Sequence, residues 1–326
     1  MSIVVTGSVA YDYLLSFPGR FREHILPEHL DKLSVSFLVD SKQTFRGGCG
    51  PNIAYSLALL GNRPKLLAAA GRDFGEFRQW LEAHGVDTSP MGIFEDEFTA
   101  TFTVITDLDH NQIAGFHTGA MARARELSLA RLNDTPIDVV IISPNDPVAM
   151  RQLAEECRQM GIPFVYDPSQ QLARMTGEEL VESMRGARVL TVNEYELEMA
   201  KAKSGLNEAG MLELVESIVV TLGPRGSRVL NRDGRVVEAP AAAARRVVEP
   251  TGVGDAFRAG LLTGLTRGYP WEVTCRLANL AAVYVIEHPG TMSHHYTLPE
   301  FVQRYRENFG DAPELEDLLR RGGEGK

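Results

Sequence analysis

Short runs of β-branched and other apolar residues alternate with longer helical patterns along most of the chain. The runs expected to be buried strands are Ile3–Thr6, Lys65–Ala69, Val139–Ser143, Pro163–Tyr166, Val189–Val192 and Ile218–Leu222. Apolar residues recur at helical spacing in the segments Asn52–Leu60, Phe74–Ala83, Val148–Met160, Tyr195–Ala202, Ala256–Thr266 and Trp271–Glu287. This succession is typical of a mostly parallel sheet covered by helices on both faces, so it predicts a three-layer α/β fold.

Two segments depart from this rhythm because apolar and polar residues alternate in them, which marks strands with one covered face. The first is Leu33–Val39 and the second is Phe98–Thr106. The second leads through a polar turn at Asp107–Asn111 into an apolar return, Ile113–Phe116. Together they predict a small sheet that projects from the body as a lid. The charged tail from Asp311 onward is expected to fray.

Length and composition suit one compact domain. The chain has 326 residues, of which 44% are hydrophobic and 23% are charged, enough to bury a full core. This length alone also suits two domains, but one α/β unit with an inserted piece fits the pattern. We therefore expect a single domain over residues 1–326, with a lid formed by about residues 13–48 and 97–118.

Charge and hydropathy argue against two classes of partner. The formal net charge of -10 and the pI near 5.4 leave no basic surface of the kind that binds a phosphate backbone, so nucleic acid is not an expected partner. No stretch approaches the roughly 18 consecutive apolar residues of a membrane span, and residues 1–8 lack the pattern of a secretory signal. We therefore expect a cytoplasmic protein that does not bind a membrane.

The cysteines and histidines do not suggest a metal site. Cys49, Cys157 and Cys275 are far apart and odd in number, so they predict reduced, buried thiols rather than a disulfide framework or a zinc site. The adjacent pair His294 and His295 has no carboxylate or cysteine at ligand spacing, and a surface loop is expected there.

The segment Glu249–Phe257 carries the clearest chemical pattern, because it places glycines around a turn that leads directly into a helix. Gly252 and Gly254 flank Val253 and let successive N–H groups point at one spot. Such a spot at a helix start holds an anion, and Asp255 beside it can reach a hydroxyl next to a phosphoryl group. For this motif alone, a tight turn with an aspartate near a helix start is the alternative. The chain contains neither the G-x-G-x-x-G nor the GxxxxGK[ST] pattern, so dinucleotide-binding and Walker-type sites are excluded.

Two further glycine-rich segments place polar side chains where α/β sheets bind ligands. The glycine pair Gly47 and Gly48 permits close approach of the backbone to a ligand, and Asn52 follows at the start of a helical run. Asn52 offers two hydrogen-bonding groups, although helix capping is an alternative role. Asp12 lies just beyond the first buried strand, at the carboxyl edge of the predicted sheet.

Asn193 and Glu196 follow another predicted strand and are spaced by one helical turn. Their side-chain oxygens can share a face and hold Mg²⁺ through water. A solvated acidic helix start is the alternative interpretation of this pair.

These segments resemble the signatures of the ribokinase (PfkB) family of carbohydrate kinases. Residues 47–61 resemble the first signature, Glu249–Phe257 resembles the second, and Asn193–Glu196 matches the family's Asn-x-x-Glu between them. The resemblance implies a ribokinase-like three-layer fold with a small β-sheet lid, and ATP and Mg²⁺ as cofactors. The chain departs from the second signature, Asp-Thr-x-Gly-Ala-Gly-Asp, where Glu249 and Pro250 stand in place of its start. Binding of a monovalent cation such as K⁺ therefore stays open.

The resemblance also implies a role for individual residues. Asp255 corresponds to the general base, and the N–H groups of Gly252, Val253 and Gly254 correspond to the anion hole. The positions implied for the sugar are Asp12, Gly47, Gly48 and Asn52. Those implied for the nucleotide are Asn193, Thr221, Gly223, Gly226 and Asn279, with Mg²⁺ held by Glu196 through water.

Long stretches from Ile3 to about Thr291 resemble bacterial adenosine kinases of the actinobacterial type. Apart from Arg46, no extra cation lies beside the sugar-site segments to neutralise a second phosphate, so a neutral acceptor is favoured. The resemblance implies that Phe102 and Phe116 of the lid contact a purine, although a small hydrophobic core is the alternative for these rings. The other residues implied for the nucleoside pocket are Ser8, Ser36, Met121, Gln170 and Gln171.

The resulting expectation is an adenosine kinase of purine salvage, which transfers phosphate from MgATP to the adenosine 5′-hydroxyl and gives AMP and ADP. A nucleoside kinase of broad specificity or a ribokinase-type sugar kinase is the alternative within enzymes. A nucleoside-binding protein without catalysis on the same fold is the alternative outside them. The resemblance to bacterial adenosine kinases also suggests a homodimer made through the lid strands, since an exposed alternating lid edge invites pairing.

Overall fold

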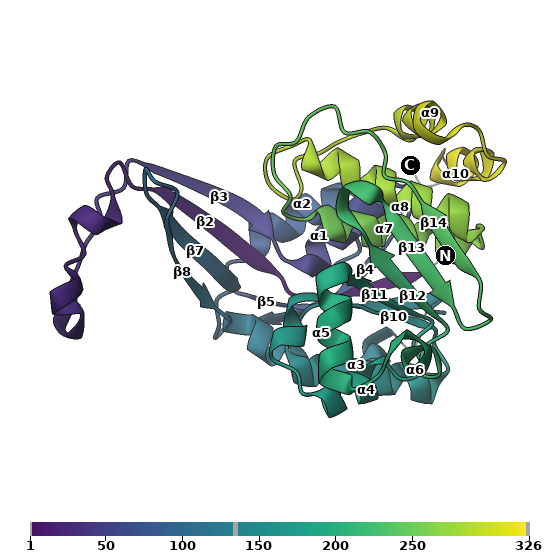
Figure 1. Ribbon diagram of the computed structural model, residues 1–326, viewed down its shortest axis with the longest axis horizontal. Coiled ribbons are helices and arrows are strands. Elements are labelled where there is room, and N and C mark those ends of the chain that lie inside the picture. The colour runs from purple at the N-terminus through teal and green to yellow at the C-terminus, as the bar shows by residue number, and fades with distance from the viewer. Residues whose placement is uncertain (1, 133–135, 324–326) are drawn as a thin grey trace.

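The computed structural model describes residues 2–132 and 136–323, which form an α/β body and a small second sheet beside it (Figure 1). The central sheet is eight-stranded, and its order from edge to edge is β14, β13, β12, β11, β10, β9, β1 and β4. The strands are β1 (Ile3–Thr6), β4 (Lys65–Leu67), β9 (Val139–Ile142), β10 (Phe164–Tyr166), β11 (Val189–Asn193), β12 (Ser217–Thr221), β13 (Ser227–Asn231) and β14 (Val236–Ala239). All pairings from β12 to β4 are parallel, whereas β13 and β14 are added antiparallel.

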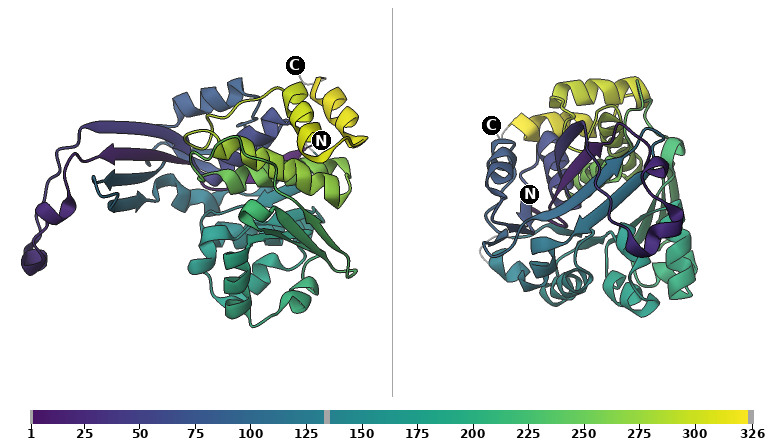
Figure 2. Two further views of the ribbon diagram at one scale, coloured as in Figure 1. Left: turned by 45° about the horizontal axis from the view of Figure 1, so that its top comes forward. Right: turned by 90° about the vertical axis from the view of Figure 1, so that its left-hand side faces the viewer.

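Helices cover both faces of this sheet (Figures 1 and 2). One face carries α1 (Cys49–Leu59), α2 (Gly75–Ala83), α7 (Val253–Arg267) and α8 (Trp271–Ile286), with α9 (Leu298–Phe309) and α10 (Glu314–Gly323) packed beyond α8. The other face carries α3 (Pro147–Met160), α4 (Gly177–Met184), α5 (Glu194–Ser204) and α6 (Glu208–Leu212). Because successive strand residues point to opposite faces, Ile3 and Val5 of β1 join the core under α1 and α7, and Val4 joins the other core. The expected three-layer α/β fold is confirmed.

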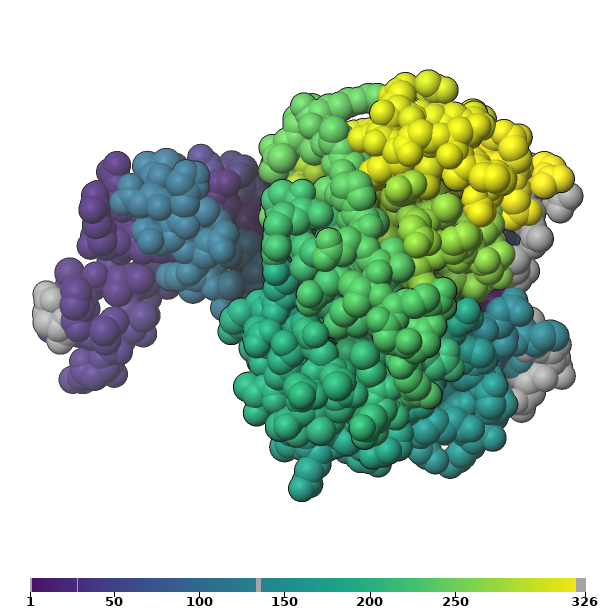
Figure 3. Space-filling view, turned by 45° about the vertical axis from the view of Figure 1, so that its right-hand side comes forward, coloured from purple at the N-terminus to yellow at the C-terminus, as the bar shows by residue number. Residues whose placement is uncertain are grey.

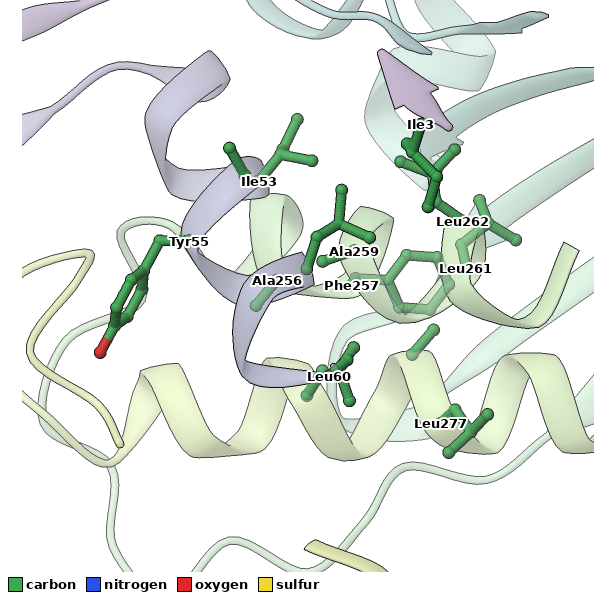
Figure 4. Packing of buried hydrophobic residues seen from close by; sticks show 14 of the residues in the cluster. Ile3, Ile53, Tyr55, Leu60, Ala256, Phe257, Ala259, Leu261, Leu262 and Leu277 are labelled. Carbon is green, nitrogen blue, oxygen red and sulfur yellow. The ribbon is translucent and has the colours of Figure 1, made fainter. Parts of the chain in front are cut away.

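Helix α7 packs closely against both α1 and α8, as the side chains in Figure 4 show. Small residues make this possible on the α8 side. A Cβ on Gly260 of α7 would lie only 2.5 Å from the Cα of Ala278 of α8, so the two backbones touch. This contact fixes the position of α7, and thereby of its first turn at the carboxyl edge of the sheet.

The second sheet has four strands in the order β3, β2, β7 and β8. These strands are β2 (Ala10–Ser16), β3 (Ser41–Gly47), β7 (Ala100–Thr106) and β8 (Gln112–His117). Residues 17–40, between β2 and β3, continue outward as an arm, and Figure 3 shows the sheet and the arm as a projection from the body. The remaining elements are the paired strands β5 (Ala69–Gly71) and β6 (Gly92–Phe94), and the 3₁₀ turns η1 (Phe21–Glu23), η2 (Pro27–Lys32), η3 (Gly119–Glu126), η4 (Leu129–Leu132), η5 (Ser169–Ala173) and η6 (Gly223–Arg225).

The strand expected at Leu33–Val39 is wrong. The partner of β2 is instead β3, which pairs with it along all seven residues. Residues 33–39 run without regular structure along the arm. Their alternation reflects the packing of Phe37, whose ring lies 4.9 Å from the rings of both Phe17 and Phe21 at the arm's aromatic cluster. The strands expected at Phe98–Thr106 and Ile113–Phe116 are confirmed as β7 and β8.

Two expectations for the C-terminal part are also wrong. Residues 312–323 do not fray as a tail, because α10 buries Leu315 and Leu318 against the core. The pair His294 and His295 lies in a loop and His295 is exposed, but His294 is not on the surface: the residue is 1% exposed, and burial lowers its pKa to about 3. His294 is covered from α1, where Ser56 Oγ lies 3.4 Å from its Nε2 and the Tyr55 ring packs against it, whereas α10 packs on α9. No helix in the described ranges has the length and apolarity needed to span a bilayer.

The contact between α7 and α8 predicts a large effect for a very small substitution. Gly260→Ala should lower the free energy of unfolding by about 1–3 kcal/mol, because the added methyl group meets backbone that cannot move independently. Urea denaturation measures this. Gly75→Ala in α2 is the matched control, since a Cβ there meets nothing within 4 Å, and a change below about 1 kcal/mol is expected. Equal stability of the two variants would contradict the close packing of α7 on α8.

Candidate functional site

A cavity of about 690 Å³ lies between the carboxyl ends of the parallel strands and the small sheet. Most of the residues singled out in the sequence line it. They are Ser8, Asp12, Gly48, Asn52, Phe102, Phe116, Met121, Gln170, Gln171, Asn193, Glu196, Thr221, Gly252, Gly254 and Asp255. These positions span almost the whole chain, so the cavity is a product of the fold as a whole.

Asp255 and Asn52 meet at a buried part of the cavity wall. Both lie in the first turns of neighbouring helices, α7 and α1, and they are 7% and 5% exposed. Asn52 Nδ2 donates a hydrogen bond to Asp255 Oδ2 at 2.8 Å. Asn52 Oδ1 is buried and has no hydrogen-bond partner among the described residues, which leaves an acceptor for a ligand hydroxyl. Burial raises the pKa of Asp255, as suits a group that must accept a proton.

The backbone around Asp255 has the form of an anion site. Gly252 precedes α7 with a φ of 81°, in the left-handed region, and no side chain caps the helix within the described residues. The N–H groups of Gly254 and Asp255 in the first turn therefore have no acceptor inside the helix. The N–H of Val253 was also expected to bind the anion, but it donates to Pro250 O at 3.3 Å instead.

Asp12 stands in a row with two aromatic side chains on the small sheet. In the strand register it lies directly opposite Phe102 of β7, which in turn lies opposite Phe116 of β8. Residues paired in this way point to the same face, and all three line the cavity. Burial raises the pKa of Asp12 to about 6, with a further contribution from the charge of Glu249. The small sheet thus presents one carboxylate and two rings toward the helix starts.

Asn193 and Glu196 form a reciprocal capping box at the start of α5. Asn193 Oδ1 accepts from the N–H of Glu196 at 2.8 Å, and Glu196 Oε2 accepts from the N–H of Asn193 at 2.9 Å. The capping alternative is therefore real, but Glu196 Oε1 has only a long contact, 3.5 Å, with the hydroxyl of Ser169. No group of three or more acidic, histidine or cysteine ligands occurs in the described residues. One carboxylate oxygen fits Mg²⁺ held largely by water and phosphate oxygens.

Three other predicted residues complete the wall. Ser8 Oγ accepts from the N–H of Cys49 at 3.3 Å, which fixes the glycine-rich turn before α1. Gln171 is 7% exposed, and its Oε1 lacks a hydrogen-bond partner in the described parts of the chain. Met121 packs with Ala10 and Ala100 in a small apolar cluster at the base of the small sheet. The first two offer polar groups, and Met121 gives an apolar surface.

The structure does not bring every predicted residue to the cavity. Those that do not line it are Ser36, Gly47, Gly223, Gly226, Val253 and Asn279. Ser36 is exposed on the arm. Asn279 Nδ2 donates to the carbonyls of Ala239 and Pro240, so this side chain joins α8 to the end of β14. Gly47 acts indirectly, because a Cβ there would lie 2.6 Å from Asp12 Oδ2.

Sequence reasoning missed three charged residues of the site. Arg258 and Arg174 line the cavity, and Asp167 is fully buried behind it, paired with Arg258. A signal was present for two of them. Arg258 follows Asp255 by three residues on the predicted helix, and Asp167 ends a predicted strand at the carboxyl edge.

The three cysteines are free, and Cys157 and Cys275 are buried as expected. Cys49 is only partly buried and lines the cavity. Glu249 Oε2 accepts from the N–H of Gly290 at 2.8 Å, which ties the start of the second signature to the turn after α8. Binding of a monovalent cation in this region stays a prediction.

Comparisons with known proteins place this site in a family. The chain is 36% identical to a nucleoside kinase from Burkholderia thailandensis, solved in complex with inosine, with a TM-score of 0.83 over 95% of this chain and 100% of that one. It is 29% identical to a nucleoside kinase from Methanothermobacter thermautotrophicus, over 96% of this chain and 98% of the relative. A nucleoside kinase from Methanocaldococcus jannaschii, described as an archaeal member of the ribokinase family, matches with a TM-score of 0.81 and 27% identity over 94% of this chain and 98% of that one.

The family model of the pfkB family carbohydrate kinases matches residues 6–297, which includes both glycine-rich signatures and every residue that lines the cavity. The signatures, the three-layer fold with its additional small sheet, and this match agree, and the chain therefore belongs to the pfkB family of carbohydrate kinases.

Proposed function

We propose that the chain is a nucleoside kinase that uses MgATP to phosphorylate the 5′-hydroxyl of adenosine and of related purine nucleosides, giving the nucleoside monophosphate and ADP. One observation carries the proposal. A buried carboxylate, Asp255, is hydrogen-bonded to Asn52 at an uncapped helix start, in one cavity with Asp12 and with the rings of Phe102 and Phe116.

The class of acceptor molecule follows from the side chains that line the cavity around Asp255. Asp12 and Asn52 suit the two hydroxyls of a ribose, since one offers carboxylate oxygens and the other an unpartnered amide oxygen. The rings of Phe102 and Phe116 suit a flat base, and the unpartnered amide oxygen of Gln171 suits its polar edge. Relatives described as nucleoside kinases, one of them solved in complex with the purine nucleoside inosine, support a nucleoside as the acceptor.

The same residues account for phosphoryl transfer. Asp255 accepts the proton of the 5′-hydroxyl while the hydroxyl oxygen forms a bond to the γ-phosphorus. At the same time, the bond between the γ-phosphorus and the oxygen that joins it to the β-phosphate breaks. The amides at Gly254 and Asp255 stabilise the charge on the transferring group. The nucleotide lies toward Asn193 and Thr221, at the ends of β11 and β12. Bound Mg²⁺, held through water by Glu196, would neutralise phosphate charge.

We further propose that the small sheet acts as the lid of a single domain that covers residues 1–326. The lid segments, about 13–48 and 97–118, contain β3, β7 and β8, most of β2 and the arm. Closure over the nucleoside would remove water from Asp255, which strengthens its electrostatic interactions and prevents transfer to water.

The acceptor range is tested by ADP formation from radiolabelled ATP with adenosine, inosine, guanosine, cytidine and ribose. Purine nucleosides should exceed ribose by at least about 100-fold in kcat/KM, because ribose leaves the ring contacts unmade. Equal kcat/KM values for ribose and the purine nucleosides would contradict a purine pocket and favour a sugar kinase. No ADP with any acceptor would favour the non-catalytic binding protein.

The base assignment predicts a specific loss. Asp255→Asn keeps the size and the contact with Asn52 but cannot accept a proton, so turnover should fall at least about 100-fold while the nucleoside Kd changes less than about threefold. Asp233→Asn, in the exposed turn between β13 and β14, is the matched control and should keep full turnover. Near-normal turnover of Asp255→Asn would refute the assignment.

We also propose a homodimer made through the small sheet. Every residue of β8 is exposed, and the arm exposes Leu26, Leu30, Leu33 and Leu38, the last at 87%. An uncovered sheet with an apolar arm is the kind of surface that another copy of the chain covers.

Light scattering after size exclusion should therefore give close to twice the chain mass of 35.9 kDa. Leu38→Asp should shift the mass toward one copy, because a charge would be buried at the contact. Val236→Asp is the control, since Val236 is 57% exposed on β14 at the far edge of the central sheet. A single-copy mass for the unaltered chain would contradict the dimer.

A further inference from the structure

Arg258 lies directly beside the proposed base. It follows Asp255 by three residues, so both side chains lie on one face of the first turn of α7. Arg258 Nη1 donates to Asp255 Oδ1 at 3.1 Å. Since Asn52 Nδ2 donates to the other oxygen at 2.8 Å, the Asp255 carboxylate is held from two sides.

A second carboxylate fixes the guanidinium. Asp167 follows β10, and its Oδ1 accepts from Arg258 Nη2 at 2.7 Å while its Oδ2 lies 2.5 Å from Nε. The Asp167 side chain is fully buried, and that of Arg258 is 11% exposed. One hydrogen bond and a second close ionic contact therefore hold the guanidinium of Arg258 against Asp167, with Nη1 directed at Asp255.

Packing keeps the guanidinium beneath the proposed anion site. A Cβ on Gly254 would lie 2.9 Å from Arg258 Nη1, so this arrangement requires that residue 254 has no side chain. Positive charge therefore lies directly behind the backbone that is proposed to bind the phosphoryl group.

The charges around Asp255 act in opposite directions. Burial raises its pKa, and the charge of Arg258 opposes that rise. Burial also raises the pKa of Asp167 to about 7, with Arg258 lowering it and Glu196 raising it. The Cys49 thiol of α1 faces the same cluster, and burial holds its pKa well above the usual range. Asp255 and Asp167 thus share the guanidinium of Arg258, so removal of either Arg258 or Asp167 changes the ionisation of Asp255.

We propose that Arg258, fixed by Asp167, is a positioning residue that directs the Asp255 carboxylate at the acceptor hydroxyl and keeps it ionised at neutral pH. The inference rests on the proposed function, in which Asp255 is the general base. Without the guanidinium, a buried carboxylate takes up a proton at higher pH, and a protonated Asp255 cannot accept the proton of the acceptor.

The test is the pH dependence of the single-turnover rate of phosphoryl transfer, with adenosine and MgATP saturating. Saturation removes from the measured rate the effect that ionisation of Asp12 has on nucleoside binding. Arg258→Met should lower the rate at pH 7 about 10- to 100-fold, with the nucleoside KM changed less than about threefold. It should also move the acid limb of the pH profile, where the rate falls as Asp255 takes up a proton, to higher pH. Asp167→Asn removes a negative charge near Asp255 and should move the acid limb to lower pH.

Arg304→Met is the matched control. Arg304 and Glu287 form another buried two-point pair, at 2.6 and 2.9 Å, and neither residue lines the cavity. This variant should lose thermal stability because it leaves a buried carboxylate unpaired, while its acid limb stays in place.

Opposite shifts in the two variants support the positioning role. If the acid limbs of the Arg258→Met and Asp167→Asn profiles stay in place, or move in the same direction, the pair of Arg258 and Asp167 only stabilises the fold. Either result would overturn the proposal. If Arg258→Met does not fold, the direction of the Asp167→Asn shift decides. Absence of ADP formation by the unaltered chain with every acceptor would refute the proposed function instead, so the two failures are distinct.

Discussion

The hydrogen bond from Asn52 to Asp255 joins two helix starts that are 203 positions apart in the chain, and the site is arranged around it. It forms because α1 and α7 lie side by side over the same face of the central sheet and begin at the same edge (Figure 4). The contact of α7 with α8 through Gly260 fixes the position of the first turn of α7 relative to the sheet. A small shift of α7 would therefore move the carboxylate, the amides behind it and the guanidinium of Arg258 together.

The cavity concentrates charge that is costly to bury. Desolvation raises the pKa values of Asp12, Asp167 and Asp255, and a protein under selection for stability alone would replace such groups with apolar ones. Here their positions suit the phosphoryl transfer proposed above. The helix start and Arg258 supply positive charge on one side of Asp255, and carboxylates stand where hydroxyl groups of an acceptor would be bound. The stability lost here is offset by two large cores on either side of the central sheet.

The body and the small sheet contribute differently to the site. The body is packed on both faces and provides the parts that must stay in register, which are the two helix starts and the strand ends. In the small sheet, the apolar cluster of Ala10, Ala100 and Met121 lies at the base and Val104 is also buried, whereas all of β8 and the first four residues of β3 are exposed. A sheet held mainly at its base can move relative to the body, which suits a part that covers a ligand. Its register still determines that Asp12, Phe102 and Phe116 face the cavity together.

The sequence by itself determined the three-layer body, the presence of helices α1 and α7, which each begin three residues before the expected start, and the residues that line most of the cavity. Strand and helix periodicity and glycine-rich turns are local properties, so they can be recognised without knowledge of what packs where. Tertiary structure decided the rest. The small sheet is completed by β2 and β3, neither of which was expected, rather than by residues 33–39, because strand pairing depends on what lies alongside and not on alternation alone. Likewise, the burial of His294 and Leu315 and the pairing of Asp167 with Arg258 depend on segments distant in sequence that meet only in the folded chain.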